Sequence, residues 1–282
     1  MTTLISWITY DQNKQSSLYI ASDSRLSWSS QVTWDSGRKV YCSSKYPDIL
    51  GYCGDVTFCS QITSQVMTYI DSCEVFEVEP SPHQRFQLIY NLIKRSFGAY
   101  PTKCALDEFS IIYATRIKKY SFAAFEIKWS KAKGWESNEL KIPNQTGIIT
   151  ASGSGGGIYK NRYRNNFERS DISGYSRSYY SCLYHHVISG DDPLTGGPIQ
   201  LAGIFNTKAA IHHGVLMGGA RYIYGMEVDE TQNMNCVRWI NENFENCDGQ
   251  ALVRHANAQR QPLPKNIGKP LGKDSRRKPL PR

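Results

Sequence analysis

The chain has 282 residues, of which 40% are hydrophobic and 12% aromatic, enough to fill the core of one large domain or two small ones. This composition excludes wholesale disorder. The formal net charge of +8 lies at one end, because nine Lys or Arg residues and one acid fall between Arg254 and Arg282. The rest of the chain is neutral, so its charge alone does not indicate a nucleic-acid-binding body.

The first predicted elements are strands. Residues 3–10 (TLISWITY) and 18–22 (LYIAS) are rich in β-branched and aromatic residues, and the polar segment between them predicts a β-hairpin. Two short strands are predicted at 39–42 and 48–53. Apolar residues at helical spacing then predict two helices, one marked by Cys59, Ile62, Val66 and Ile70 and the next by a series from Phe86 to Phe97.

Strands return in the second half of the chain, interrupted by a second pair of helices. The predicted strands are 108–115, 119–129, 146–151, 199–205, 209–216 and 221–227; the predicted helices are 156–167, 175–189 and a short one near 236–245. Two helix pairs between runs of strands predict an α+β fold, a four-layer αββα sandwich of two antiparallel sheets flanked by helix pairs. We expect one domain over residues 1–250.

Residues 251–282 form a basic segment that contains five prolines and almost no apolar periodicity. Such a segment cannot bury enough surface to offset its ordering entropy, so we expect a disordered tail. It either is a solvated terminus or contacts nucleic acid, an acidic partner or a membrane surface.

The eight cysteines include no CxxC pair, and the sequence has neither a secretory signal nor a long apolar run. We therefore expect a reduced, cytoplasmic protein without a transmembrane helix. The adjacent pairs His185–His186 and His212–His213 lack the spacing of metal ligands, so no metal or other cofactor is expected.

Thr2 follows the initiator methionine, which is normally removed when the second residue is small. A threonine hydroxyl needs a nearby base, and the free α-amine of an N-terminal threonine can act as one, with a pKa near ~7.7–8.0. Many chains begin Met-Thr, so this feature is weak evidence when taken alone.

Two further motifs strengthen it: YIASDSR at 19–25 and GRKV at 37–40, which place Asp23 and Lys39 sixteen residues apart. This pattern resembles the proteasome β-subunit family, including the simpler bacterial threonine protease that works with a AAA+ unfoldase. The resemblance, which covers about residues 2–230, implies that Asp23 and Lys39 lie beside the Thr2 nucleophile. The lysine would favour the deprotonated forms of nearby groups. A surface salt bridge is the alternative interpretation.

Three more segments extend the resemblance. LGYCGD at 50–55 implies that the Gly54 N–H lines an oxyanion hole, although an extra residue before it could shift that role to Asp55. SGSGGG at 152–157 implies that Ser154 assists the terminal amine, and DDPLTGG at 191–197 implies the same for Asp192 and for Thr195, which replaces the usual serine.

The same alignment implies that four residues face a specificity pocket: Leu26, Gly37, Tyr52 and Val56. They indicate a preference for apolar residues before the cleaved bond, while core packing is the simpler explanation for three of them.

The resemblance implies a threonine endopeptidase that acts by acyl transfer on peptide or unfolded protein, in a ring-shaped homo-oligomer. Any AAA+ unfoldase would be a separate protein, because the chain has no Walker motif. Two alternatives remain open: an N-terminal-nucleophile amidohydrolase acting on small amides, and a non-catalytic, proteasome-like assembly or binding subunit.

Overall fold

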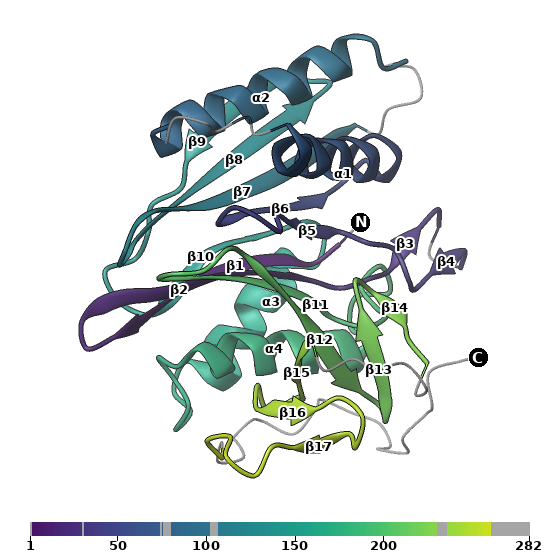
Figure 1. Ribbon diagram of the computed structural model, residues 1–282. Coiled ribbons are helices and arrows are strands. Elements are labelled where there is room, and N and C mark those ends of the chain that lie inside the picture. Colours follow the sequence, from purple (N-terminus) through teal and green to yellow (C-terminus); the bar gives the residue numbers. More distant parts are fainter. Residues whose placement is uncertain are drawn as a thin grey trace.

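Two large β-sheets pack face to face in the computed structural model (Figure 1). The structure describes residues 2–29, 31–73, 75, 80–101, 107–229 and 236–260. Buried aliphatic side chains from both sheets meet between them, including Leu4 and Ile20 from one sheet and Val40 and Ile112 from the other. The burial of this apolar surface stabilises the pairing of the sheets.

The larger sheet has ten strands, and its central order is β10-β1-β2-β11-β12-β15-β16-β17. β13 pairs with β12, and β14 pairs with β13. The strands are β1 (Leu4–Asp11), β2 (Lys14–Ser22), β10 (Gly147–Ser152), β11 (Gln200–Phe205), β12 (Ile211–Met217), β13 (Ala220–Ile223), β14 (Met226–Glu227), β15 (Arg238–Ile240), β16 (Asn246–Asp248) and β17 (Val253–Arg254).

The smaller sheet has five strands in the order β5-β6-β7-β8-β9. Its strands are β5 (Val40–Cys42), β6 (Asp48–Cys53), β7 (Glu108–Lys118), β8 (Ser121–Ser130) and β9 (Gly134–Glu139). A separate two-stranded sheet joins β3 (Leu26–Ser27) to β4 (Thr33–Trp34).

Helices α1 (Val56–Ser72) and α2 (Pro82–Gly98) lie against the five-stranded sheet (Figure 1). Asp55 caps the start of α1 by accepting a hydrogen bond from the Phe58 N–H. Ser81 and Gln84 form a capping box at the start of α2, where the proline in the first turn needs no N–H partner. The apolar faces of both helices pack over this sheet in one core cluster.

The opposite face of the ten-stranded sheet is covered by α3 (Gly156–Arg162), a π-helical turn (Tyr163–Phe167) and α4 (Ser176–Ser189). Aromatic side chains contribute to this contact: the ring of Trp7 in β1 lies 6.3 Å from that of Tyr179 in α4, and Trp7 also stacks on Tyr19 of β2 at 5.0 Å. This aromatic packing holds β1 and β2 firmly against the helices.

The predicted four-layer αββα sandwich of two antiparallel sheets is wrong. The described residues form a mixed α/β structure with four α-helices and many strands in large sheets. The ten-stranded sheet is not purely antiparallel, since β12 pairs with β15 in parallel. The second predicted helix pair contains one helix of only seven residues followed by a π-helical turn, and a third small sheet is present.

Among the local predictions, the N-terminal hairpin is confirmed, because β1 and β2 pair antiparallel from Leu4↔Ser22 to Asp11↔Lys14. The short helix predicted near 236–245 is wrong. That segment holds β15 and the turn leading to β16, since Trp239 and Ile240 extend the sheet and are buried.

Residues 251–260 lie within the described part of the chain, where β17 pairs with β16. The remainder of the predicted basic tail, residues 261–282, lies outside the described residues. In the described part of the chain, no helix has the length and apolar character needed to span a membrane.

Ile89 tests the packing of α2 on the five-stranded sheet, because its side chain is fully buried. We expect Ile89→Ala to lower the free energy of unfolding by about 2–4 kcal/mol, from lost apolar burial and the cavity left behind. Gln87→Ala, at an exposed position of the same helix, is the control and should change it by less than about 0.5 kcal/mol. Urea denaturation measures both; equal effects would contradict this packing.

His213 makes stability depend on pH. Burial lowers its pKa to about 3, and neither ring nitrogen has a hydrogen-bond partner. The unfolded chain therefore binds more protons than the folded chain between about pH 6.5 and about pH 3, so the free energy of unfolding falls as the pH drops through that window.

We expect His213→Phe to remove a destabilisation on the order of 3 kcal/mol between pH 7 and about pH 4. Chemical denaturation at the two pH values measures it, with His255→Phe at an exposed position as the control. Identical pH dependence in wild type and His213→Phe would refute the prediction.

Candidate active site

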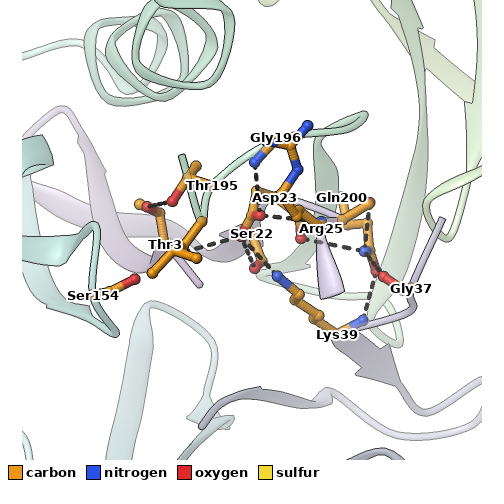
Figure 2. Close-up of polar contacts among 12 residues, drawn as sticks. Thr3, Ser22, Asp23, Arg25, Gly37, Lys39, Ser154, Thr195, Gly196 and Gln200 are labelled. Carbon is orange, nitrogen blue, oxygen red and sulfur yellow. Dashed lines mark hydrogen bonds and ion pairs between the residues drawn. The ribbon is translucent and has the colours of Figure 1, made fainter. Parts of the chain in front are cut away.

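The Asp23 carboxylate is the centre of a buried polar cluster at the end of β2 (Figure 2). Its Oδ1 accepts hydrogen bonds from the Thr3 N–H at 3.0 Å and from Lys39 Nζ at 3.0 Å. Its Oδ2 accepts from the backbone N–H groups of Arg25 and Gly196, each at 3.1 Å. These four donors take the place of water around a carboxylate that has no solvent exposure.

Lys39, immediately before β5, supplies the cation of this cluster and is also completely buried. Burial lowers the pKa of Lys39, an effect that the neighbouring Asp23 carboxylate opposes. Asp23 directly follows β2 of the ten-stranded sheet, and Lys39 directly precedes β5 of the five-stranded sheet. The ion pair therefore joins the two sheets. The structure thus brings together the two residues that the family resemblance implied to lie side by side, and their full burial excludes a surface salt bridge.

The N-terminal strand runs directly past this ion pair. Thr2 is buried, and its carbonyl oxygen accepts a hydrogen bond from the Gly155 N–H at 3.4 Å. The loop 152–157 approaches so closely that a Cβ on Gly153 would lie 2.0 Å from the Thr2 oxygen, and one on Gly155 would lie 1.8 Å from Thr3 Oγ1. Contact with the N-terminal strand therefore requires glycine at positions 153 and 155.

A chain of hydroxyl groups runs from Thr3 to Asp192. Thr195 Oγ1 donates to Asp192 Oδ2 at 2.7 Å, and Thr3 Oγ1 lies 2.8 Å from Thr195 Oγ1. Because the Thr195 proton points to Asp192, Thr3 must donate to Thr195. Thr3 Oγ1 then accepts from His186 Nε2, 3.0 Å away.

This order assigns the Nε2–H tautomer to His186, whose pKa is lowered chiefly by burial. A histidine that donates to Thr3 cannot act as its general base, so Thr3 is a bound structural hydroxyl rather than a nucleophile. The Thr195 hydroxyl, predicted to orient the terminal amine, is engaged by Thr3 and Asp192.

Ser154 lies on the same side of the cluster as Thr3 and Thr195 (Figure 2). Ser154 is exposed, and its Oγ donates to Asp192 Oδ2 over a long 3.4 Å. Asp192 is buried and closes its own loop by accepting from the Leu194 N–H at 3.0 Å. Because the hydrogen bond from Ser154 to Asp192 is long and the Ser154 side chain is exposed, the Ser154 hydroxyl is only weakly engaged.

Gly54 follows the last residue of β6 and has a φ of +101°, which favours glycine. A Cβ there would lie 2.5 Å from the Glu108 oxygen, so Gly54 is packed against the start of β7. The preceding residue, Cys53, is buried, and its Cβ would lie 3.3 Å from a Cβ built on Gly153 in the loop after β10. Burial raises the pKa of the Cys53 thiol to about 12, so this thiol is neutral.

The four predicted pocket residues do not share one environment: two of them are in contact, and the other two lie elsewhere. Leu26 is buried and covers Gly37, where an added Cβ would come within 2.3 Å of the leucine side chain. Tyr52 packs in the core below α1 and donates its hydroxyl to the Arg38 oxygen at 3.0 Å. Val56 is half-buried in the first turn of α1. Leu26 and Gly37 are thus in contact, whereas Tyr52 has the packing expected of a core residue.

Sequence reasoning missed four residues of the cluster: Thr3, His186, Cys53 and Gln200. Gln200 begins β11, and its amide contacts the segments that carry Asp23 and Lys39 (Figure 2). Two of the four had a signal in the sequence. Thr3 and Cys53 directly adjoin predicted site residues, whereas nothing in the local sequence marks His186 or Gln200.

Possible metal ligands, the second histidine pair and the cavity are the other features that could mark a functional site. No group of three His, Cys, Asp or Glu residues that could hold a metal ion occurs within the described ranges. His212 lies 3.3 Å from the Arg38 guanidinium. A cavity of about 640 Å³ is lined by residues 236–239, 246–247 and 255–258, none of which belongs to the Asp23 cluster.

The buried Asp23–Lys39 pair has an exposed counterpart of equal length, Lys131–Asp107, also at 3.0 Å. We expect Lys39→Met to lower the free energy of unfolding by about 3–5 kcal/mol, because it leaves the Asp23 carboxylate buried without its cation. Lys131→Met should cost less than about 1 kcal/mol. Urea denaturation at pH 7 measures both; a similar small loss in each would show that the Asp23 cluster is solvated.

Comparison with known proteins gives no family assignment. No protein-family model matches the chain, and no curated protein matches it.

Proposed function

We propose that the chain is a threonine-type endopeptidase in which Thr2 becomes the nucleophile after removal of Met1. The observation that carries the proposal is the buried Asp23–Lys39 ion pair, whose Asp23 carboxylate also accepts the backbone N–H of Thr3, the residue after the nucleophile. A charged pair without solvent exposure is costly to maintain, and such groups concentrate at functional sites.

The elements around Thr2 support the same proposal. The ends of β2 and β10 lie beside the start of β1, because Leu4 pairs with both Ser22 and Ser152. This register brings Asp23, Ser154 and the Gly155 N–H to the N-terminus of one strand. The loop with Asp192 and Thr195 is tied to the same place through Thr3.

The proposed reaction is acyl transfer. The Thr2 hydroxyl attacks the peptide carbonyl carbon and loses its proton to the free α-amine, directly or through water. The leaving amine takes a proton, and water then hydrolyses the Thr2 ester to release the acid and restore the hydroxyl. Lys39 stabilises negative charge that develops on the Thr2 oxygen, and a backbone N–H at the end of β6, near Gly54, stabilises the oxyanion.

Ser154 is the side chain best suited to assist the amine, since its hydroxyl is exposed and only weakly held by Asp192. Asp192 and Thr195 do not contact the amine themselves in this proposal. They hold Thr3 and the 191–197 loop in place. Peptide or unfolded protein is the proposed substrate, and a ring-shaped homo-oligomer with a separate AAA+ unfoldase is the proposed assembly. An activity confined to small amides would instead support the amidohydrolase alternative.

The proposal predicts a covalent adduct on Thr2. A peptide epoxyketone reacts with both the hydroxyl and the free amine of an N-terminal threonine, so the intact mass should show loss of one methionine and gain of one inhibitor. We expect the adduct to disappear in Thr2→Ala and to persist in Thr2→Ser, which retains a hydroxyl. Fragmentation mass spectrometry locates it.

Retention of Met1 without an adduct, in chain that is folded by circular dichroism, would reject the peptidase mechanism. The non-catalytic subunit would then be the better description. An adduct on a residue other than Thr2 would reject the assignment of the nucleophile.

A further inference from the structure

Gln200 connects the segments on either side of the ion pair. Its side chain is buried at the first position of β11. The Oε1 atom accepts the backbone N–H of Lys39 at 2.9 Å and that of Val40 at 3.3 Å. The Nε2 atom donates to Ser24 Oγ at 2.7 Å and to the backbone oxygen of Gly37 at 2.8 Å. The backbone oxygen of Asp23 lies 3.5 Å from it. Figure 2 shows Gln200 beside Gly37 and Lys39.

These partners require an amide. Backbone N–H groups can bond only to an acceptor and backbone oxygens only to a donor, so the partners fix which atom of Gln200 is oxygen and which is nitrogen. Ser24 Oγ donates its own proton to the Pro198 oxygen at 2.6 Å and therefore accepts from Gln200. Glutamate would lose both donors, and an apolar side chain would leave several buried backbone groups unpaired.

The position of Gln200 explains how two residues from different sheets are held at one distance. Gln200 pairs with Ser22 across β11 and β2, next to Asp23, while its side chain reaches the backbone on both sides of Lys39. We propose that Gln200 is a positioning residue that holds Lys39 against Asp23 beside Thr2. Gln200 touches none of the proposed reacting atoms and acts only through Lys39 and Asp23. The effect of Gln200 on the reactivity of Thr2 rests on the proposed function. Its role in holding Lys39 in place does not.

The rest of the Lys39 segment has an independent anchor. The Arg38 guanidinium lies between the rings of Tyr41 and Tyr224, at 4.3 Å and 4.2 Å from their centroids. The Tyr52 hydroxyl also donates to the Arg38 oxygen. Loss of Gln200 should therefore release Lys39 locally while the segment remains attached to the fold.

The test compares Gln200→Met with Gln15→Met in the full-length chain. Gln15 is a matched control because its side chain also joins the two sheets, accepting from the Phe122 N–H at 2.9 Å and donating to the Tyr10 hydroxyl at 3.2 Å. Gln15 lies eight residues before Asp23, roughly 26 Å away along the strand.

The first readout is the ¹H–¹⁵N NMR cross-peak of the Lys39 ammonium group, assigned by its absence in Lys39→Met. Buried ammonium protons exchange slowly with water, so the cross-peak should be present in the wild type. We expect Gln200→Met to abolish it, because Lys39 leaves Asp23 and its protons exchange with solvent. Gln15→Met should leave it in place.

The second readout is the rate of Thr2 modification by the epoxyketone between pH 6 and pH 9. We expect Gln200→Met to slow it about tenfold and to change its pH profile, whereas Gln15→Met keeps the wild-type profile. If no adduct forms in the wild type but the Lys39 cross-peak is still lost in Gln200→Met, the proposed function fails and the positioning role stands.

A Lys39 cross-peak at its wild-type position in folded Gln200→Met would overturn the inference. If Gln200→Met does not fold, Ser24→Ala replaces it, because it removes the hydroxyl that accepts from Nε2, together with the hydrogen bond from that hydroxyl to the Pro198 oxygen. Weakening of the Lys39 cross-peak in Ser24→Ala would then support the role of Gln200, and an unchanged cross-peak would refute it.

Discussion

The Asp23 carboxylate is the interaction on which the rest of the site depends. An ionised carboxylate with no solvent exposure is stable only if strong donors replace water, and Asp23 receives them from Thr3, Arg25, Lys39 and Gly196. These donors come from the residue before β1, the segment after β2, the residue before β5 and the loop before β11. Their convergence fixes four distant parts of the chain at one point.

Close backbone approach is the second constraint. Gly153 and Gly155 allow the loop after β10 to contact the backbone and side chains of Thr2 and Thr3, which any Cβ would prevent. The same loop presents Ser154 at the surface and leads into α3. Close glycine contacts on one side and a buried ion pair on the other confine the N-terminal strand, as the proposed acyl transfer through Thr2 would require.

The division between fixed and adjustable groups follows from burial. Thr3, Thr195 and His186 are buried and bonded in one proton order, so they define structure. Ser154 is exposed and weakly bonded, so it can respond to a ligand. Gln200 extends the fixed part across both sheets, because its amide satisfies backbone groups that the strands themselves leave unpaired.

The sequence by itself determined the N-terminal hairpin and the two long helices, since hydrophobic periodicity is a property of neighbouring residues. The pairing of Asp23 with Lys39 was expected from the resemblance of their motifs to a known family, and the contact itself is made in the tertiary structure. The structure alone decided the rest. Strands formed where a helix was predicted near 236–245, because β12 offers a sheet edge with which β15 pairs in parallel. The local sequence does not show that this edge is present. His186 and Gln200 join the cluster through hydrogen bonds to residues more than 160 positions away in the sequence, and no local sequence pattern predicts such contacts.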